Sequence, residues 1–249
     1  MSSIAVIGGT GFEQMTDFAV ESESATLTPW GRASHPALRG RIGGHTLWYL
    51  PRHGRPHHLP PHRINYRANL WLLREQGVQQ VIAINAVGGL RAELQPGQLL
   101  APSQIIDYTW GREHSYYDGE ETGLEHVDFS FPYSAKLRSK LLLAAAACGE
   151  DCIDGGVYAA TQGPRLESAA EVTRLHRDGG DVVGMTGMPE AGLARELGLN
   201  YASLCLVVNP GAGLAEQPIT LDAMREVLET SASRVSAVIT RLLAAAERG

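Results

Sequence analysis

The densest group of side chains that could do chemistry lies between Arg52 and His62. These eleven residues include two arginines and four histidines, and the prolines among them exclude a regular helix. A guanidinium can bind phosphate oxygens through two N–H groups, and a neutral histidine can donate a further hydrogen bond. The pattern therefore favours a phosphate dianion as ligand. A metal site and a solvated polar loop are the alternatives, and the lack of acidic residues between Trp30 and Glu75 disfavours the metal.

Three glycine-containing segments follow apolar runs and could also approach an anion. They are Gly8–Gly11, Asn85–Gly89 and Gly184–Glu190. Glycine lets backbone N–H groups come close to a bound oxygen, and the partial positive charge at a helix N-terminus favours an anion beside the last segment. Thr10 and Thr186 add hydroxyl donors. The chain therefore carries several loops that are suited to an anion.

Simpler interpretations of these segments stay open. The first segment resembles the opening of a dinucleotide-binding fold, although the third glycine of that motif would fall on Glu13 or Gln14. It could also be a purely structural turn. Met185 and Met188 in the last segment would by default pack in the core. No single segment decides among these interpretations.

Alternating strands and helices are predicted to position the loops, from apolar runs and helical spacing. The predicted strands are Ile4–Ile7, Val78–Ile84, Gly156–Thr161, Val182–Met185 and Tyr201–Val208. The predicted helices are Ile64–Glu75, Ser134–Cys148, Leu166–Arg177, Pro189–Leu197 and Thr220–Glu247. Residues 109–132 lack periodicity and predict a long loop over a site. Because no linker or repeat interrupts the alternation, we predict one α/β domain over residues 1–249.

Composition disfavours several classes of protein. Of the 249 residues, 44% are hydrophobic and 19% charged, which is typical of a globular chain, and the formal net charge of −6 disfavours nucleic acid as a partner. The three cysteines form no CxxC pair, so structural thiols in a reducing compartment are expected. Without a targeting segment or 18 continuous apolar residues, the sequence predicts a cytoplasmic protein that binds no membrane.

Seven motifs follow one another along the chain. They are IGGTG at Ile7, RHG at Arg52, NYRAN at Asn65, a glycine pair at Gly88, QPGQL at Gln95, QGPRLES at Gln162 and GMTGMPE at Gly184. In this order they resemble the trimeric purine nucleoside phosphorylases, and most closely the methylthioadenosine phosphorylase branch. The resemblance implies a mixed central β-sheet, partly barrel-like and flanked by helices, in a homotrimer with each site at a subunit boundary. It also implies neither metal nor cofactor, with inorganic phosphate as co-substrate.

Members of this family cleave nucleosides by phosphorolysis, in which phosphate attacks the anomeric carbon from the face opposite the departing purine. The phosphate stabilises the positive charge that develops on the sugar and then captures it. The resemblance implies that Met185 lies under the ribose and donates its backbone N–H to a sugar hydroxyl. With His57 close by, the residues expected to hold the phosphate are Thr10, Arg52, His53, Asn85, Ala86 and Thr186. Because asparagine replaces the usual threonine at position 85, the contact there is expected from the backbone.

Two positions in the base site depart from the methylthioadenosine branch. That branch has an aspartate where this chain has Asn209, whose amide can accept from a protonated purine N7 and donate to a 6-oxo group. At the position of Glu167, the resemblance implies a serine in that branch. The carboxylate of Glu167 can accept a hydrogen bond from the N1–H of hypoxanthine. Asn209 is therefore the predicted catalytic residue, for a 6-oxopurine. The other residues expected at the base are Leu166 in place of a stacking aromatic, Pro210, and Gly211 in place of a second acid.

The 5′ end of the nucleoside is predicted to be apolar. Leu221 aligns with a small apolar residue of the methylthio branch, where inosine-cleaving relatives have a histidine, and Met224 follows one turn later. These side chains would bury a methylthio group and leave a 5′-hydroxyl unpaired. The resemblance thus implies phosphorolysis of 5′-methylthioinosine. As an alternative, Leu221 is simply a core residue.

Four other functions stay open. Within the family, the chain could be an inosine/guanosine phosphorylase, which differs only in its 5′ pocket, or a 5′-methylthioadenosine phosphorylase. Outside it, the chain could be a dinucleotide-binding oxidoreductase or a nucleoside-binding protein without catalysis. Either phosphorylase would release purine only when phosphate is present, whereas the oxidoreductase and the binding protein would release none.

Overall fold

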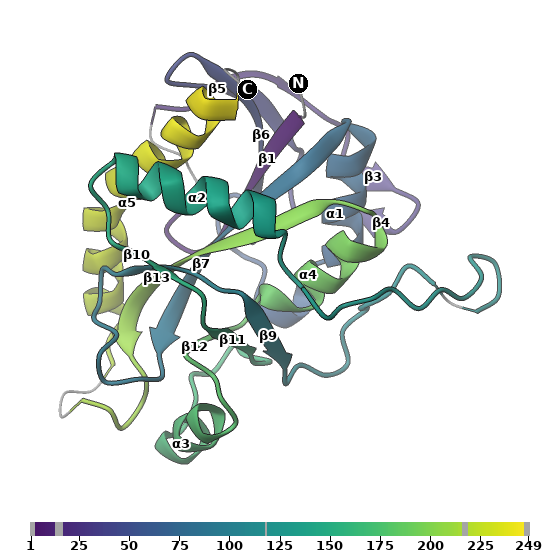
Figure 1. Cartoon of the computed structure of the whole chain (residues 1–249). Helices are drawn as coiled ribbons and strands as arrows, with labels where there is room; N and C mark the ends of the chain where they lie inside the picture. Colours follow the sequence, from purple (N-terminus) through teal and green to yellow (C-terminus); the bar gives the residue numbers. More distant parts are fainter. Residues whose placement is uncertain (1–2, 13–16, 118, 216–218, 247–249) are drawn as a thin grey trace.

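The central strand of the fold is β7, which extends over Val78–Gly89 in the computed structural model (Figure 1). It pairs in parallel with both β1 (Ser3–Gly8) and β13 (Asn200–Pro210). These strands are apolar along most of their length because both faces of this part of the sheet are covered. The structure describes residues 3–12, 17–117, 119–215 and 219–246.

Antiparallel pairings extend this parallel centre into a mixed sheet. On one side β6 pairs in parallel with β1, and β5 and β2 follow it in antiparallel order. On the other side β13 pairs with β8, which pairs with β10. The last residues of β7 also pair with β12, so the sheet branches there to β11 and β9. The bounds are β2 Ala19–Glu23, β5 Leu38–Ile42, β6 His45–Pro51, β8 Leu99–Ala101, β9 Gln104–Asp107, β10 Cys152–Asp154, β11 Val157–Ala160 and β12 Val182–Gly184, with a separate ribbon of β3 Leu27–Thr28 and β4 Gly31–Arg32.

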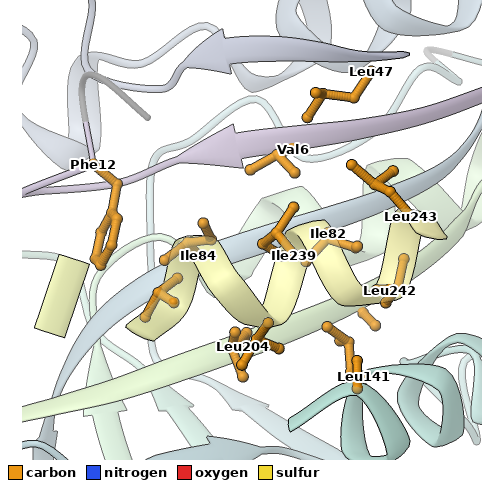
Figure 2. Packing of buried hydrophobic residues seen from close by; sticks show 14 of the residues in the cluster. Val6, Phe12, Leu47, Ile82, Ile84, Leu141, Leu204, Ile239, Leu242 and Leu243 are labelled. Carbon is orange, nitrogen blue, oxygen red and sulfur yellow. The ribbon is translucent and has the colours of Figure 1, made fainter. Parts of the chain in front are cut away.

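One face of the sheet is covered by α2 (Ala135–Ala147) and α5 (Leu221–Ala246). Figure 2 shows how Ile239 of α5 packs over the strands, beside Ile82 of β7 and Leu204 of β13. Alternate residues of a strand point to opposite faces, so this core takes every second residue of the central strands.

The opposite face of the sheet is covered by α1 (Tyr66–Glu75) and α4 (Gly187–Glu196). Here the alternate residues Val81 and Ala83 of β7 are buried. The shorter α3 (Ala169–Arg177) packs separately, on β11 and β12. A single turn of 3₁₀ helix, η1 (Pro61–Arg63), precedes α1.

All five predicted strands and all five predicted helices occur, with ends that differ by a few residues; Glu247, the predicted end of the last helix, lies outside the described residues. Ser134 caps α2 as expected, since its hydroxyl accepts from the Leu137 N–H. Ser168 and Glu171 form a capping box at α3, which is why this helix begins three residues later than predicted. The predicted mixed sheet flanked by helices is confirmed.

Several parts of the sheet differ from the sequence-based prediction, and the short strands β8, β9 and β10 are among those that were not predicted. Asn85–Gly89 was expected to be a loop, but these residues continue β7 because β13 pairs with it as far as Gly89. The hairpin of β5 and β6, with β2 at its edge, was not predicted at all. Its β2 strand is exposed throughout and β5 alternates buried and exposed residues, so neither contains the continuous apolar run that identified the central strands.

Residues 109–132, predicted as a long loop, contain no helix or strand among those described. In Figure 1 this connection between β9 and α2 extends away from the body of the fold before it returns. Within the described ranges, the helices lack the length and apolar content that would let one cross a membrane.

Candidate active site

A cavity of about 630 Å³ lies at the carboxyl ends of β1, β7, β12 and β13. Gly9 and Thr10 after β1, Ala86–Gly88 of β7 and Gly184–Thr186 after β12 all contribute to its wall. Ligands of α/β proteins bind at this edge of the sheet because the strand ends bring separate loops together there. The glycine-containing segments that the sequence singled out therefore meet at one cavity.

Most of the predicted site residues line this cavity. They are Thr10, Arg52, His53, Ala86, Leu166, Glu167, Met185, Thr186, Asn209, Gly211 and Leu221. His57 and Met224 line it as well. Asn85 and Pro210 lie outside its lining, because the Asn85 side chain is buried between β7 and β13 and the carbonyl of Pro210 accepts a hydrogen bond from Asn209.

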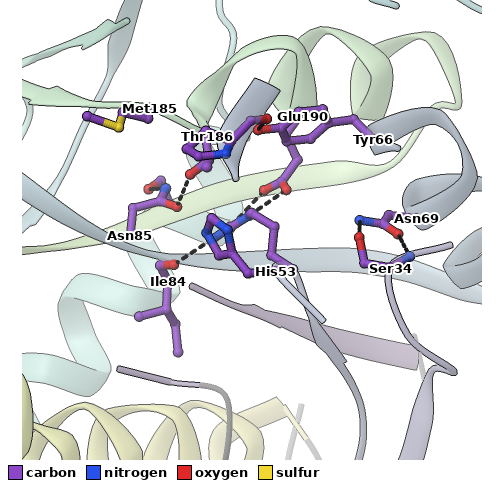
Figure 3. A network of polar contacts seen from close by, with 12 residues as sticks. Ser34, His53, Tyr66, Asn69, Ile84, Asn85, Met185, Thr186 and Glu190 are labelled. Atoms are coloured by element: carbon purple, nitrogen blue, oxygen red, sulfur yellow. Dashed lines mark hydrogen bonds and ion pairs between the residues drawn. The ribbon is translucent and has the colours of Figure 1, made fainter. Parts of the chain in front are cut away.

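Arg52, at the end of β6, is fully buried and forms an ion pair with Glu190 of α4 (Figure 3). Its Nε and one terminal nitrogen donate to the two Glu190 carboxylate oxygens at 2.8 and 2.9 Å, and the other terminal nitrogen donates to the Ile84 carbonyl at 3.1 Å. Burial alone would lower the pKa of Arg52, but attraction by Glu190 outweighs it and raises the pKa. Glu190 therefore occupies the edge formed by Nε and one terminal nitrogen. Arg52 can offer a ligand only the N–H groups that these bonds leave.

A chain of side-chain hydrogen bonds holds Thr186 in place. Its hydroxyl donates to Asn85 Oδ1 at 3.2 Å, and Asn85 Nδ2 donates to the Ser203 hydroxyl at 2.8 Å (Figure 3). The Asn85 side chain therefore orients Thr186 rather than facing the cavity. To donate its hydroxyl proton to a phosphate oxygen, Thr186 must turn away from Asn85.

His53 and His57 stack with their ring centres 4.3 Å apart. His53 Nδ1 lies 2.8 Å from the Leu59 carbonyl oxygen, which can only accept, so Nδ1 carries a proton. A neutral His53 then has an acceptor at Nε2, and only the imidazolium form can donate there. The expectation that a neutral His53 donates to phosphate thus does not fit this geometry.

The structure fixes the orientation of the Asn209 amide at the end of β13. Its nitrogen donates to the Pro210 carbonyl at 2.7 Å, so Oδ1 lies on the opposite side of the amide. Gly211 follows, and an added Cβ there would lie 2.9 Å from the Gly89 carbonyl oxygen and 2.9 Å from Val172. Gly211 therefore gives the turn room to pass β7, and an acid could not occupy this position without a shift of the backbone.

Glu167 and Leu166 come from the segment before α3. One Glu167 oxygen accepts from the Thr161 hydroxyl at 2.7 Å, and the carboxylate is half-buried. The Leu166 side chain is partly exposed at the cavity wall. A carboxylate and an apolar side chain thus lie beside each other, as a base-binding site requires.

Apolar side chains at the start of α5 form another part of the wall. Leu221 lines the cavity together with Met224 and Ile219, and Leu221 is 67% exposed in the single chain. The alternative that Leu221 is a core residue is therefore wrong. A methylthio group could lie against this surface.

Two buried charged residues were missed by the sequence analysis. Glu190 appeared only within the GMTGMPE motif. The sequence around it gives no indication of its partner Arg52, which lies 138 positions away. Arg112 lies in the aperiodic loop, yet it is only 9% exposed and donates to the carbonyls of Met185, Met188 and Gln162 at 2.6 to 2.8 Å. Only the folded chain brings these acceptors together.

Among the described residues, no three His, Cys, Asp or Glu side chains gather in a way that could hold a metal ion. Three of the histidines of residues 52–62 instead bond to backbone carbonyls or stack: His58 bonds to the Pro56 carbonyl, and His53 stacks with His57.

The sequence and the fold of this chain are similar to those of known proteins. Residues 3–244 match the model of the phosphorylase superfamily. The chain belongs to the phosphorylase superfamily. A probable S-methyl-5′-thioinosine phosphorylase of Pseudomonas syringae is 46% identical over 98% of this chain and 100% of its own length, and a 6-oxopurine nucleoside phosphorylase of Pyrococcus furiosus is 41% identical over 98% and 92%. Among solved structures, the methylthioadenosine phosphorylase of Schistosoma mansoni in complex with adenine superposes with a TM-score of 0.93 at 30% identity, covering all of this chain and 93% of the other.

These matches confirm the family that the seven motifs predicted, and with it an enzyme of the pentosyltransferase class. The dinucleotide-binding interpretation of the first glycine segment is excluded by the same matches; Glu13 and Gln14 lie outside the described residues. The roles of individual site residues stay predictions.

We predict that Glu190→Gln lowers the free energy of unfolding by about 3 to 5 kcal/mol, because it leaves the buried Arg52 charge without its counter-charge. Urea unfolding of the variant and the parent measures this difference. Glu21→Gln is the matched control, since its pair with Arg41 is exposed and should cost at most about 1 kcal/mol. Equal costs for the two substitutions would contradict the assigned importance of the buried pair.

Proposed function

We propose that the enzyme catalyses phosphorolysis of 5′-methylthioinosine to hypoxanthine and 5-methylthioribose 1-phosphate. The observation that carries the proposal is one cavity that combines three sets of groups. Arg52, Thr10 and Thr186 suit a phosphate, Asn209 and Glu167 suit a 6-oxopurine, and the start of α5 supplies apolar contacts. One relative is named for S-methyl-5′-thioinosine, which carries both the methylthio group and a 6-oxopurine, and another is named for 6-oxopurine nucleosides; both names support the proposal.

In the reaction the bond from the anomeric carbon to purine N9 breaks while a phosphate oxygen forms a new bond to that carbon. Positive charge develops on the sugar and negative charge on the purine. The phosphate dianion stabilises the first charge. A proton or hydrogen bond at N7 relieves the second, and Asn209 is the group that we assign to it.

The choice of base follows from the donors and acceptors that the site presents. Because Asn209 Nδ2 lies toward the Pro210 carbonyl, its Oδ1 can accept from a protonated N7, and the remaining N–H can donate to a 6-oxo group. Glu167 can accept from the N1–H of hypoxanthine, whereas the N1 lone pair of adenine would meet a carboxylate oxygen. Both residues therefore favour a 6-oxopurine over adenine.

The 5′ substituent is the less constrained part of the proposal. Leu221 and Met224 offer an apolar surface and would leave a 5′-hydroxyl without a partner. An inosine/guanosine phosphorylase is the second candidate, and the Pyrococcus furiosus relative named as a 6-oxopurine nucleoside phosphorylase favours it.

The proposal includes inorganic phosphate as co-substrate and neither an organic cofactor nor a metal. It further includes a cytoplasmic homotrimer with each site at a subunit boundary, without nucleic acid or membrane as a partner. The exposure of Leu221 supports this arrangement, since a neighbouring subunit would have to cover the 5′ end for a methylthio group to be buried.

The three substrates 5′-methylthioinosine, inosine and 5′-methylthioadenosine test the proposal directly. With phosphate present, we expect kcat/KM for 5′-methylthioinosine to exceed that for each of the others by about tenfold or more. Without phosphate, purine release should fall to background. Inosine turned over as well as 5′-methylthioinosine would remove the methylthio assignment, and indifference to phosphate would remove phosphorolysis.

The substitution Asn209→Asp should move activity toward 6-aminopurines, because a carboxylate can accept from a 6-amino group where the amide donates. We expect the ratio of kcat/KM for 5′-methylthioadenosine over 5′-methylthioinosine to rise about tenfold, the worth of one hydrogen bond. Asn200→Asp, at the exposed start of the same strand, is the control. An unchanged ratio in Asn209→Asp would show that base choice lies elsewhere.

The substitution Leu221→Ala should lower kcat/KM for 5′-methylthioinosine by about tenfold and leave that for inosine nearly unchanged, because it removes apolar contact only from the methylthio group. Leu143→Ala on α2 is matched in type and exposure, at 69% against 67%, and should change neither value. A parallel loss on both substrates would argue for a structural role of Leu221 instead.

A further inference from the structure

Glu167 stands in the wall between two cavities. Besides the nucleoside cavity, it lines a second cavity of about 330 Å³ together with Thr161, Arg165 and Arg174. The carboxylate can therefore turn toward a base on one side or toward guanidinium groups on the other. The carboxylate can accept a hydrogen bond from the N1–H of a purine only when it faces the nucleoside cavity.

Thr161 holds one oxygen of this carboxylate. Its hydroxyl donates to Glu167 Oε1 at 2.7 Å, while the other acceptor within reach, the Gly184 carbonyl, is 3.4 Å away. The position of Thr161 is itself fixed at the end of β11, because its backbone N–H donates to the Gly184 carbonyl at 2.8 Å. The hydroxyl is thus an anchor on a rigid strand end.

Arg165 is the competitor for the same carboxylate. It is exposed and makes two hydrogen bonds to Glu171, at 2.7 and 2.8 Å. Its pKa is raised, mainly by these bonds and the charge of Glu171 and least by the charge of Glu167. Glu171 is held in turn by the Ser168 N–H in the capping box of α3. The bonds to Glu171 thus engage both terminal nitrogens of Arg165.

We propose that Thr161 is a positioning residue that sets base selectivity by anchoring Glu167 Oε1, so that Oε2 stays available to the N1–H of a 6-oxopurine. Glu171 assists by engaging Arg165. The inference rests on the proposed function, because it assumes that Glu167 reads the base. An anchored carboxylate both accepts from hypoxanthine N1–H and repels the lone pair of adenine N1, whereas a carboxylate free to turn toward Arg165 does neither.

The test compares Thr161→Val, which has nearly the same shape without the donor, with Thr161→Ser, which keeps the hydroxyl. The readout is the ratio of kcat/KM for 5′-methylthioinosine over 5′-methylthioadenosine, measured on one preparation, which does not depend on the fraction of folded enzyme. We expect Thr161→Val to lower this ratio about tenfold and Thr161→Ser to keep it within about twofold of the parent. Thr173→Val is the control, because that exposed hydroxyl bonds only to the Ala169 carbonyl of its own helix.

A double-substitution cycle with Glu167→Ala, which removes the acceptor of the Thr161 hydroxyl, shows whether Thr161 acts through Glu167. In the Glu167→Ala background, adding Thr161→Val should change the ratio by less than about twofold. An unchanged ratio in Thr161→Val alone, or an undiminished effect of that substitution without the carboxylate, would overturn the inference. The parent enzyme separates the two claims: if it shows no preference for 6-oxopurines, the proposed function fails, and if it shows the preference but Thr161→Val keeps it, only the inference fails.

Discussion

The buried ion pair of Arg52 and Glu190 is the interaction on which the site depends. It joins the end of β6 to α4, and its neighbours tie in the central strands, since Arg52 also donates to the Ile84 carbonyl of β7 and Tyr201 of β13 donates to Glu190 at 2.9 Å. Four elements that are distant in sequence thus meet at one pair of opposite charges. A buried charge is stable only beside its counter-charge, because no water solvates it. The four elements therefore have little freedom to move relative to one another.

Arg112 is a second buried charge that joins separate segments. Its described partners are oxygens of carbonyl, amide and hydroxyl groups, including the carbonyls of Met185 and Met188 and those of Thr161 and Gln162. It therefore links the segment of Met185 and Met188 to the segment that carries Glu167. The long loop thus contributes to the fold through one arginine that bonds to both segments.

Sequence reasoning predicted the parts of this enzyme whose signals are local. The strands of the parallel centre are continuous apolar runs, and motifs such as IGGTG and GMTGMPE mark loops at their ends, so both could be placed from the chain alone. What it could not supply were pairings over long separations. Glu190 takes up one edge of the Arg52 guanidinium, which the sequence alone did not indicate, and the pairing with β13 turns an expected loop at Asn85 into strand. Neither pairing produces a recognisable pattern in the sequence around these residues.

Gly211 illustrates how such packing constrains the evolution of this enzyme. The resemblance to the methylthioadenosine branch implies an acid at this position, yet here even a methyl group would press against the Gly89 carbonyl and Val172. A lineage that acquires the acid must first, or at the same time, move the end of β7 or reshape α3. Exchange of this side chain alone would therefore disturb the backbone, so an acid at this position requires more than one change in the sequence.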